Sequence, residues 1–148
     1  GKLRAVDVAT KDDGPMRPNG IAVTPDQGTL AVSDHGGRHT WVWRIERDGS
    51  LSQRQPYITL RTPSPDLPSK GDGMTTDSVG RYYVTSAVGI QMFDQTGRMG
   101  GVISAPTDKP IVSVAFAGPG QSYLYVASGD KIFRRKTSTS GFVHPVQR

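Results

Sequence analysis

The chain has 148 residues, of which 34% are hydrophobic, and it contains 18 glycines, 11 prolines and no cysteine. This composition favours one turn-rich β domain with its own core, and the lack of cysteine excludes a disulfide framework and a thiolate metal site. The net charge is +5, but the basic residues are scattered apart from Lys131, Arg134, Arg135 and Lys136, so we predict no nucleic-acid partner. No apolar run reaches the ~18 residues that span a bilayer, so we predict no membrane partner either.

Short strands separated by turns follow one another along the chain. Residues 1–10 (GKLRAVDVAT) predict an outer strand of a preceding unit, and the loop KDDGPMRPNG follows it. Three similar stretches then begin at Pro18 (PNGIAVTPDQGTLAVSD), Gly71 (GDGMTTDSVGRYYVTSA) and Val112 (VSVAFAGPGQSYLYVAS). Each predicts a strand, a turn rich in Pro, Gly or Asp, and a second strand.

Further strands extend these three units. A third strand is predicted in each by TWVWRIE, GIQMFDQ and DKIFRRK, and a fourth in the first two by SLSQRQPYITL and GRMGGVISAP. Four short strands repeated every ~40–50 residues are typical of β-propeller blades. We therefore predict an all-β fold, a partial β-propeller of about three four-stranded blades, with a β-sandwich of about ten strands as the alternative.

The predicted blades divide one partial propeller over residues 1–148. Its parts are the outer strand of a preceding blade with its loop (1–17), a blade (18–67), a second blade (68–108), an incomplete blade (109–137) and a tail (138–148). Propellers close with about four to eight blades, so about three cannot close. We therefore expect a missing N-terminal half, or two copies that complete one ring, and self-association through exposed strand edges.

Equivalent positions of the repeats carry Asn19, Asp72 and Ser113, each at the start of a predicted first strand. The first strands of propeller blades line the central channel, so we expect these residues to gather at its mouth. Amide and carboxylate oxygens suit a hard divalent cation such as Ca²⁺ or Mg²⁺, and Zn²⁺ also accepts oxygen ligands. Asn19 and Asp72 are therefore candidate metal ligands and Ser113 a candidate substrate contact, with turn residues bonded to local backbone as the alternative.

His35 and Arg38 lie in the loop after the second strand of the first blade, near the expected channel mouth. Both are candidate substrate contacts, with exposed loop residues as the alternative. His39 follows His35 at the spacing of two zinc ligands on a helix, but Gly36 and Gly37 between them argue against a helix. The chain has no G-x-S-x-G motif, so it lacks the usual elbow of a Ser/His/Asp hydrolase.

A set of motifs over about residues 15–135 also has a familiar order: RPNGIAVTPDQGTLAVSD, DGSLSQRQPYITL, GDGM, GIQMFDQTGR and SVAFAGPGQSYLYVAS. They resemble the C-terminal half of the gluconolactonase and regucalcin family, also called the senescence-marker-protein family. The resemblance implies a six-bladed propeller with one divalent cation at the channel mouth. Asn19 matches the family's metal-binding Asn, and Asp72 matches its metal-binding Asp, which is also the general base. Gly71 and Ser113 depart from the Pro and Asn that are common there, and the family's Glu ligand and its substrate-binding Asn and Arg belong to the other half.

This resemblance implies a carboxylic-ester hydrolase that opens a sugar lactone or related ester, or the C-terminal half of such an enzyme. Its cofactor would be one divalent cation, Ca²⁺ before Zn²⁺ or Mg²⁺, and its catalytic residue Asp72, which would activate water. The alternative is a non-catalytic β-propeller module that binds a ligand or a protein, because propellers host many unrelated activities. No targeting segment is visible, and the chain starts at Gly1 without Met, so cytoplasmic and periplasmic locations both stay open.

Overall fold

The computed structural model describes residues 1–7 and 13–143. In this part of the chain there are eleven strands, one short 3-10 turn, η1 (Pro119–Gln121), and no α-helix. The strands are β1 (Pro18–Val23), β2 (Thr29–Asp34), β3 (His39–Ile45), β4 (Leu51–Thr59), β5 (Met74–Thr76), β6 (Tyr82–Ser86), β7 (Gly89–Phe93), β8 (Met99–Ile103), β9 (Ile111–Ala117), β10 (Tyr123–Ser128) and β11 (Lys131–Lys136). None of the described residues belongs to a helix with the length and apolarity needed to cross a membrane.

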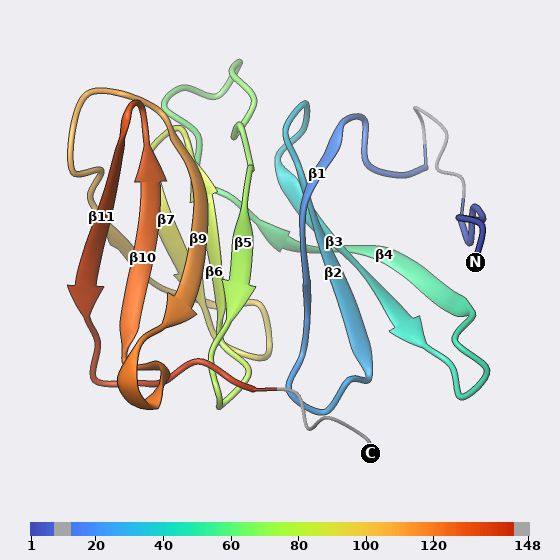
Figure 1. Ribbon diagram of the computed structural model, residues 1–148. Helices are drawn as coiled ribbons and strands as arrows, with labels where there is room; N and C mark the ends of the chain where they lie inside the picture. The colour runs from blue at the N-terminus through green and yellow to red at the C-terminus, as the bar shows by residue number, and fades with distance from the viewer. Residues whose placement is uncertain (8–12, 144–148) are drawn as a thin grey trace.

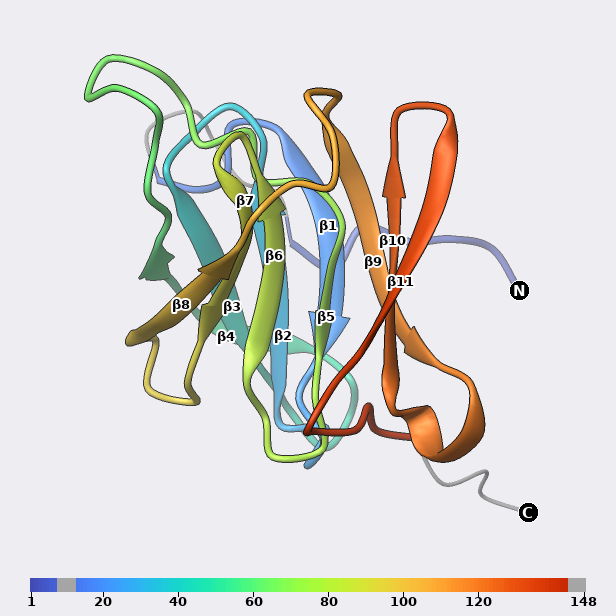
Figure 2. The ribbon, with the colours of Figure 1, turned by 90° about the vertical axis from the view of Figure 1, so that its left-hand side faces the viewer.

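The strands form three antiparallel sheets in which each strand pairs with its neighbour in sequence. The orders are β1-β2-β3-β4, β5-β6-β7-β8 and β9-β10-β11, and Figure 1 shows the three sheets side by side. Strand β1 contacts β5, and β5 contacts β9, so the first strands of the three sheets are neighbours, as the turned view in Figure 2 also shows. These sheets are consecutive propeller blades. The predicted all-β propeller is confirmed, and the sandwich alternative is wrong.

The two ends of the described chain are tied to the blades by polar contacts. The outer strand expected within residues 1–10 falls partly on residues 8–12, outside the described residues, and residues 1–7 form no strand. Asp7 accepts hydrogen bonds from the Trp43 indole and the Arg54 guanidinium, which hold it against β3 and β4. In the tail, Gly141 forms an isolated bridge with Asp77 of the second blade, and residues 144–148 are outside the described part.

Two hydrophobic clusters hold the blades together, one at each junction. The first blade meets the second through Ala31, Val42, Ile58, Leu60, Met74, Tyr82, Val84 and Phe93. The second meets the third through Tyr83, Ile90, Ile111, Val114, Leu124 and Val126. Because successive strand residues point to opposite faces, β6 sends Tyr82 and Val84 to the first cluster and Tyr83 to the second. The middle blade is therefore packed on both faces, and all five residues of β6 are buried.

Candidate active site at the channel mouth

The candidate site lies at the end of the propeller where the first strands of the blades begin, the upper side in Figure 1. A Cβ built on Gly20 would overlap the carbonyl oxygen of Asp72, and one built on Gly73 would lie 2.6 Å from the Cα of Ser113. Real Cβ atoms do not come this close, so only glycine fits at both positions. The Asn-Gly and Asp-Gly pairs thus let neighbouring blades approach, and they place Asn19, Asp72 and Ser113 on adjoining strand starts.

Hydroxyl side chains of the second strands fix this junction. Ser33 Oγ, which is fully buried, accepts a hydrogen bond from Gly20 N at 2.8 Å and donates one to the carbonyl oxygen of Asp72 at 2.7 Å. Thr85 Oγ1 donates to the carbonyl oxygen of Gly73 at 2.9 Å. Buried polar groups need such partners, so each hydroxyl both satisfies backbone groups and sets the position of the strand start. The backbone of Asp72 is therefore held from two blades.

The carboxylate of Asp72 has one oxygen engaged and one open. Oδ1 accepts a hydrogen bond from Gly73 N at 3.0 Å, whereas Oδ2 lies 3.9 Å from His35 Nδ1, beyond hydrogen-bond distance. The two side chains are 21% and 29% exposed, and His35 Nδ1 is itself buried without a hydrogen-bond partner among the described residues. Both line a cavity of about 560 Å³, with Lys70, Ser86, Ala87, Ala105, Thr107, Asp108, Lys109, Pro110, Ile111 and Val112. An open carboxylate oxygen beside a cavity can accept a proton or bind a cation.

The loop that carries His35 is shaped by a buried carboxylate. Asp34 is 2% exposed, and its oxygens accept hydrogen bonds from the backbone N–H groups of Met16, Arg17 and Gly36. His35 N in turn donates to the carbonyl oxygen of Arg17 at 2.9 Å. These bonds set the loop against the segment before β1. Asp34 therefore has a structural role: it holds the loop that positions His35 at the cavity.

Two lysines on the cavity wall were not predicted from the sequence. Lys70 has a φ of 53°, in the left-handed region that costs a non-glycine residue about 1–2 kcal/mol. Its neighbour Ser69 compensates by donating from Oγ to the carbonyl oxygen of Gly37 and accepting from Gly71 N. Lys109 pairs through Nζ with Asp130 at 3.0 Å on the exposed rim. The positive φ is the feature that distinguishes Lys70 from other surface lysines, and a backbone angle cannot be read from the sequence.

The structure brings His35 to Asp72 but leaves the other predicted side chains off the cavity wall. Asn19, Arg38 and Ser113 are exposed, and none of the three lines the cavity. His39 contacts Thr59 instead of forming a pair with His35. Among residues 1–7 and 13–143, no group of three or more His, Asp or Glu side chains is arranged to hold a metal ion.

The three blades, with a glycine-flanked aspartate at the channel mouth, place this chain among the β-propeller proteins. Residues 3–130 match the family model described as the SMP-30/Gluconolactonase/LRE-like region, so the chain belongs to this family.

The chain is similar to part of the length of two curated relatives. It is 30% identical over 132 residues to the gluconolactonase of Zymomonas mobilis subsp. mobilis, covering 86% of this chain and 37% of the relative. It is 32% identical over 128 residues to the pentonolactonase XacC of Haloferax volcanii, covering 83% and 42%. The fold is similar to that of the calcium-binding protein regucalcin from Agrobacterium tumefaciens, with a TM-score of 0.75 and 20% identity over 90% of this chain and 50% of that one. The chain thus spans less than half the length of the curated relatives it matches.

Proposed function

We propose that the protein hydrolyses a sugar lactone or related ester, with this chain contributing the C-terminal half of a gluconolactonase-like site. The observation that carries the proposal is the open oxygen of Asp72, which adjoins a cavity of about 560 Å³ at the channel mouth. Both curated relatives are named as lactonases, which favours a hydrolase over a binding module that has no catalysis.

In this proposal Asp72 is the general base. As water attacks the lactone carbonyl, a C–O bond forms, one O–H bond of the water breaks, and the proton moves to Oδ2 of Asp72. Collapse of the tetrahedral adduct then breaks the ring C–O bond, and the proton passes to the departing ring oxygen, which gives the hydroxy acid. Because Gly73 N holds Oδ1 at 3.0 Å, the second oxygen is kept toward the cavity. His35 closes one side of this position, 3.9 Å away.

The residues at the strand starts supply part of the oxygen ligands that a divalent cation needs. The amide of Asn19 and the carboxylate of Asp72 are hard oxygen donors on adjoining strand starts, and regucalcin is described as calcium-binding. Two protein oxygens are fewer than the about six to eight ligands that Ca²⁺ takes, so the remaining ligands would come from water, substrate or residues outside this set. When bound, such an ion would polarise the lactone carbonyl. We place Ca²⁺ first, with Zn²⁺ and Mg²⁺ as alternatives.

The test is lactone hydrolysis by the 148-residue chain, with glucono-, pentono- and aliphatic lactones, in Ca²⁺, Mg²⁺, Zn²⁺ or chelator. We expect turnover with at least one cation and a fall of about 10²–10⁴-fold in Asp72→Asn, the range for loss of a general base. Asp108→Asn is the matched control, because Asp108 is an exposed carboxylate on the same cavity wall. Turnover in Asp72→Asn equal to that of the unsubstituted chain would contradict the proposal, whereas no turnover from either would show that the site needs the residues of the other half.

A further inference from the structure

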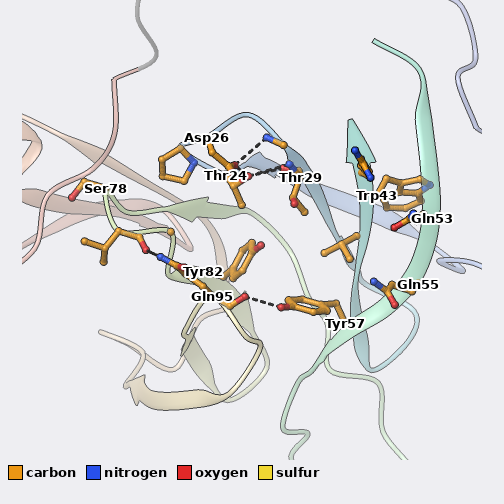
Figure 3. A pocket seen from close by; sticks show the side chains of 16 residues that line it. Thr24, Asp26, Thr29, Trp43, Gln53, Gln55, Tyr57, Ser78, Tyr82 and Gln95 are labelled. Carbon is orange, nitrogen blue, oxygen red and sulfur yellow. Dashed lines mark hydrogen bonds between the residues drawn. The ribbon is translucent and has the colours of Figure 1, made fainter. Parts of the chain in front are cut away.

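A second cavity, of about 600 Å³, lies between the two complete blades at the opposite end of the strands from Asp72. Strand β1 runs away from the channel mouth, and the turn that follows it, residues 24–29, forms one wall. Strands β3 and β4 and the turn at residues 78–80 form the others. Figure 3 shows Tyr57, Tyr82 and Gln55 around this space. We call it the interblade groove. Its volume is in the range of small-molecule sites, about 300–1,000 Å³.

Tyr82 presents an unpaired hydroxyl to the interblade groove. The residue is 3% exposed and belongs to the first hydrophobic cluster, yet its hydroxyl makes no hydrogen bond with any described residue. The hydroxyl is not among the buried side-chain atoms that lack a partner, so it opens onto the groove and its solvent. Burial raises the pKa of Tyr82 to about 12, so the phenol stays protonated and can donate at neutral pH. A ligand in the groove would replace water as its acceptor.

Strand β4 adds amide groups without partners. Gln53, Gln55 and Tyr57 of β4 all line the groove. The side chains of Gln53 and Gln55 make no hydrogen bond within the described structure, and each offers both donors and an acceptor. Gln53 also has a φ of 53°, at an irregularity in the β3–β4 pairing. Such strain in a non-glycine residue is found where surrounding structure imposes it, often at binding sites.

The aromatic rings and the charges of the groove select the ligand class. Tyr57 donates its hydroxyl to the carbonyl oxygen of Gln95 at 2.7 Å, which fixes its ring across the junction. One carboxylate, Asp26, and one guanidinium, Arg44, are on the lining, and Arg44 is also paired with Glu46 at 3.5 Å. Hydrogen bonds from Thr24 and Gly28 lower the pKa of Asp26 and keep it ionised. A fixed aromatic ring and free amides suit a neutral, hydroxyl-rich ligand with an apolar face.

We propose that the interblade groove binds a neutral saccharide of one or two rings, with hydroxyls bonded by Tyr82 and Gln55 and an apolar sugar face against Tyr57. The groove shares no lining residue with the cavity at Asp72. Sugar binding in the groove is therefore a separate proposal from lactone hydrolysis at Asp72.

The experiment is ligand-observed saturation-transfer NMR and titration of the 148-residue chain with glucose and maltose as neutral probes and gluconate as the charged comparison. We expect both neutral probes to bind, Tyr82→Phe to weaken binding roughly fivefold, as for one lost hydrogen bond, and Gln55→Ala to weaken it by a similar factor. Tyr125→Phe, on β10 away from the groove, is the matched control and should bind normally. Gln55 is exposed, so Gln55→Ala keeps the comparison valid if Tyr82→Phe disturbs the core.

Three results would overturn the proposal. One is no saturation transfer to either neutral sugar at millimolar concentration. The second is unchanged affinity in both Tyr82→Phe and Gln55→Ala. The third is loss of sugar binding in Asp72→Asn, which would place the ligand at the channel mouth instead.

Discussion

Asp72 and Asp77 flank the same short strand, β5, but their surroundings differ in almost every respect. Asp77 is fully buried, and its oxygens accept hydrogen bonds from the N–H groups of Val79 and Arg81, the Arg81 guanidinium, and the hydroxyls of Tyr83 and Thr139. Asp72 is partly exposed and, among the described residues, its carboxylate accepts one hydrogen bond, from Gly73 N. A carboxylate whose acceptor sites are all used stabilises the fold. One that keeps an oxygen open at a cavity is available for chemistry.

The largest expected effect on stability is at the structural end of β5. Asp77→Ala removes a partner from five donors at once and breaks the link to Thr139 of the tail, so we expect a loss of about 3 kcal/mol in the free energy of unfolding. Urea denaturation measures it. Asp108→Ala, at an exposed position, should change this free energy by less than about 0.5 kcal/mol. A loss below about 1 kcal/mol in Asp77→Ala would show that the network contributes little.

A second effect follows from the tyrosine beside Asp77. Burial, and then the carboxylate of Asp77, raise the pKa of Tyr83 from 10.0 to about 12. The folded state therefore keeps this proton at a pH where the unfolded state has lost it. The resulting stability is complete below pH 10 and is lost as pH rises toward 12, with a total of about 2.7 kcal/mol.

Urea denaturation between pH 8 and pH 11.5 would record this alkaline loss. Tyr83→Phe cannot ionise at this position, so its stability should fall less steeply over the same range. Parallel curves for the two proteins would mean that Tyr83 does not titrate in this window.

The smallest of these effects is at the functional end. Ser33→Ala removes the hydroxyl that links Gly20 N to the carbonyl oxygen of Asp72, and we expect a loss of about 1–2 kcal/mol in the free energy of unfolding. Ser50→Ala is the control, because Ser50 is exposed and, among the described residues, its hydroxyl bonds only to Asp48 in its own turn. If lactone turnover falls in Ser33→Ala by no more than in Ser50→Ala, then this link does not position Asp72.

The fold could be predicted from the sequence because strands and turns have local sequence patterns. Alternation in TLAVSD and YLYVAS, and turns at regular spacing, indicate strands without knowledge of distant contacts. The repeat register also placed Asn19, Asp72 and Ser113 correctly on adjoining strand starts. That register determines where a backbone lies and not where a side chain points. This is why Asn19 and Ser113 can occupy equivalent positions without lining the cavity.

What the sequence could not show depends on contacts between distant segments. Asp34, Asp72 and Asp77 are the same residue type near strand ends, and what distinguishes them is the set of donors that folds around Asp34 and Asp77. The approach of His35 to Asp72 likewise depends on the loop that Asp34 holds. The interblade groove draws on two blades and several turns, so no single motif predicts it.

The most direct test of the central claim measures stability and lactone turnover on the same preparation of Asp72→Asn. Our account predicts a free energy of unfolding within about 1 kcal/mol of the unsubstituted chain, because one hydrogen bond is affected, together with a loss of at least about 10²-fold in turnover. A large fall in stability with turnover preserved would contradict it, and would make Asp72 a structural carboxylate like Asp77.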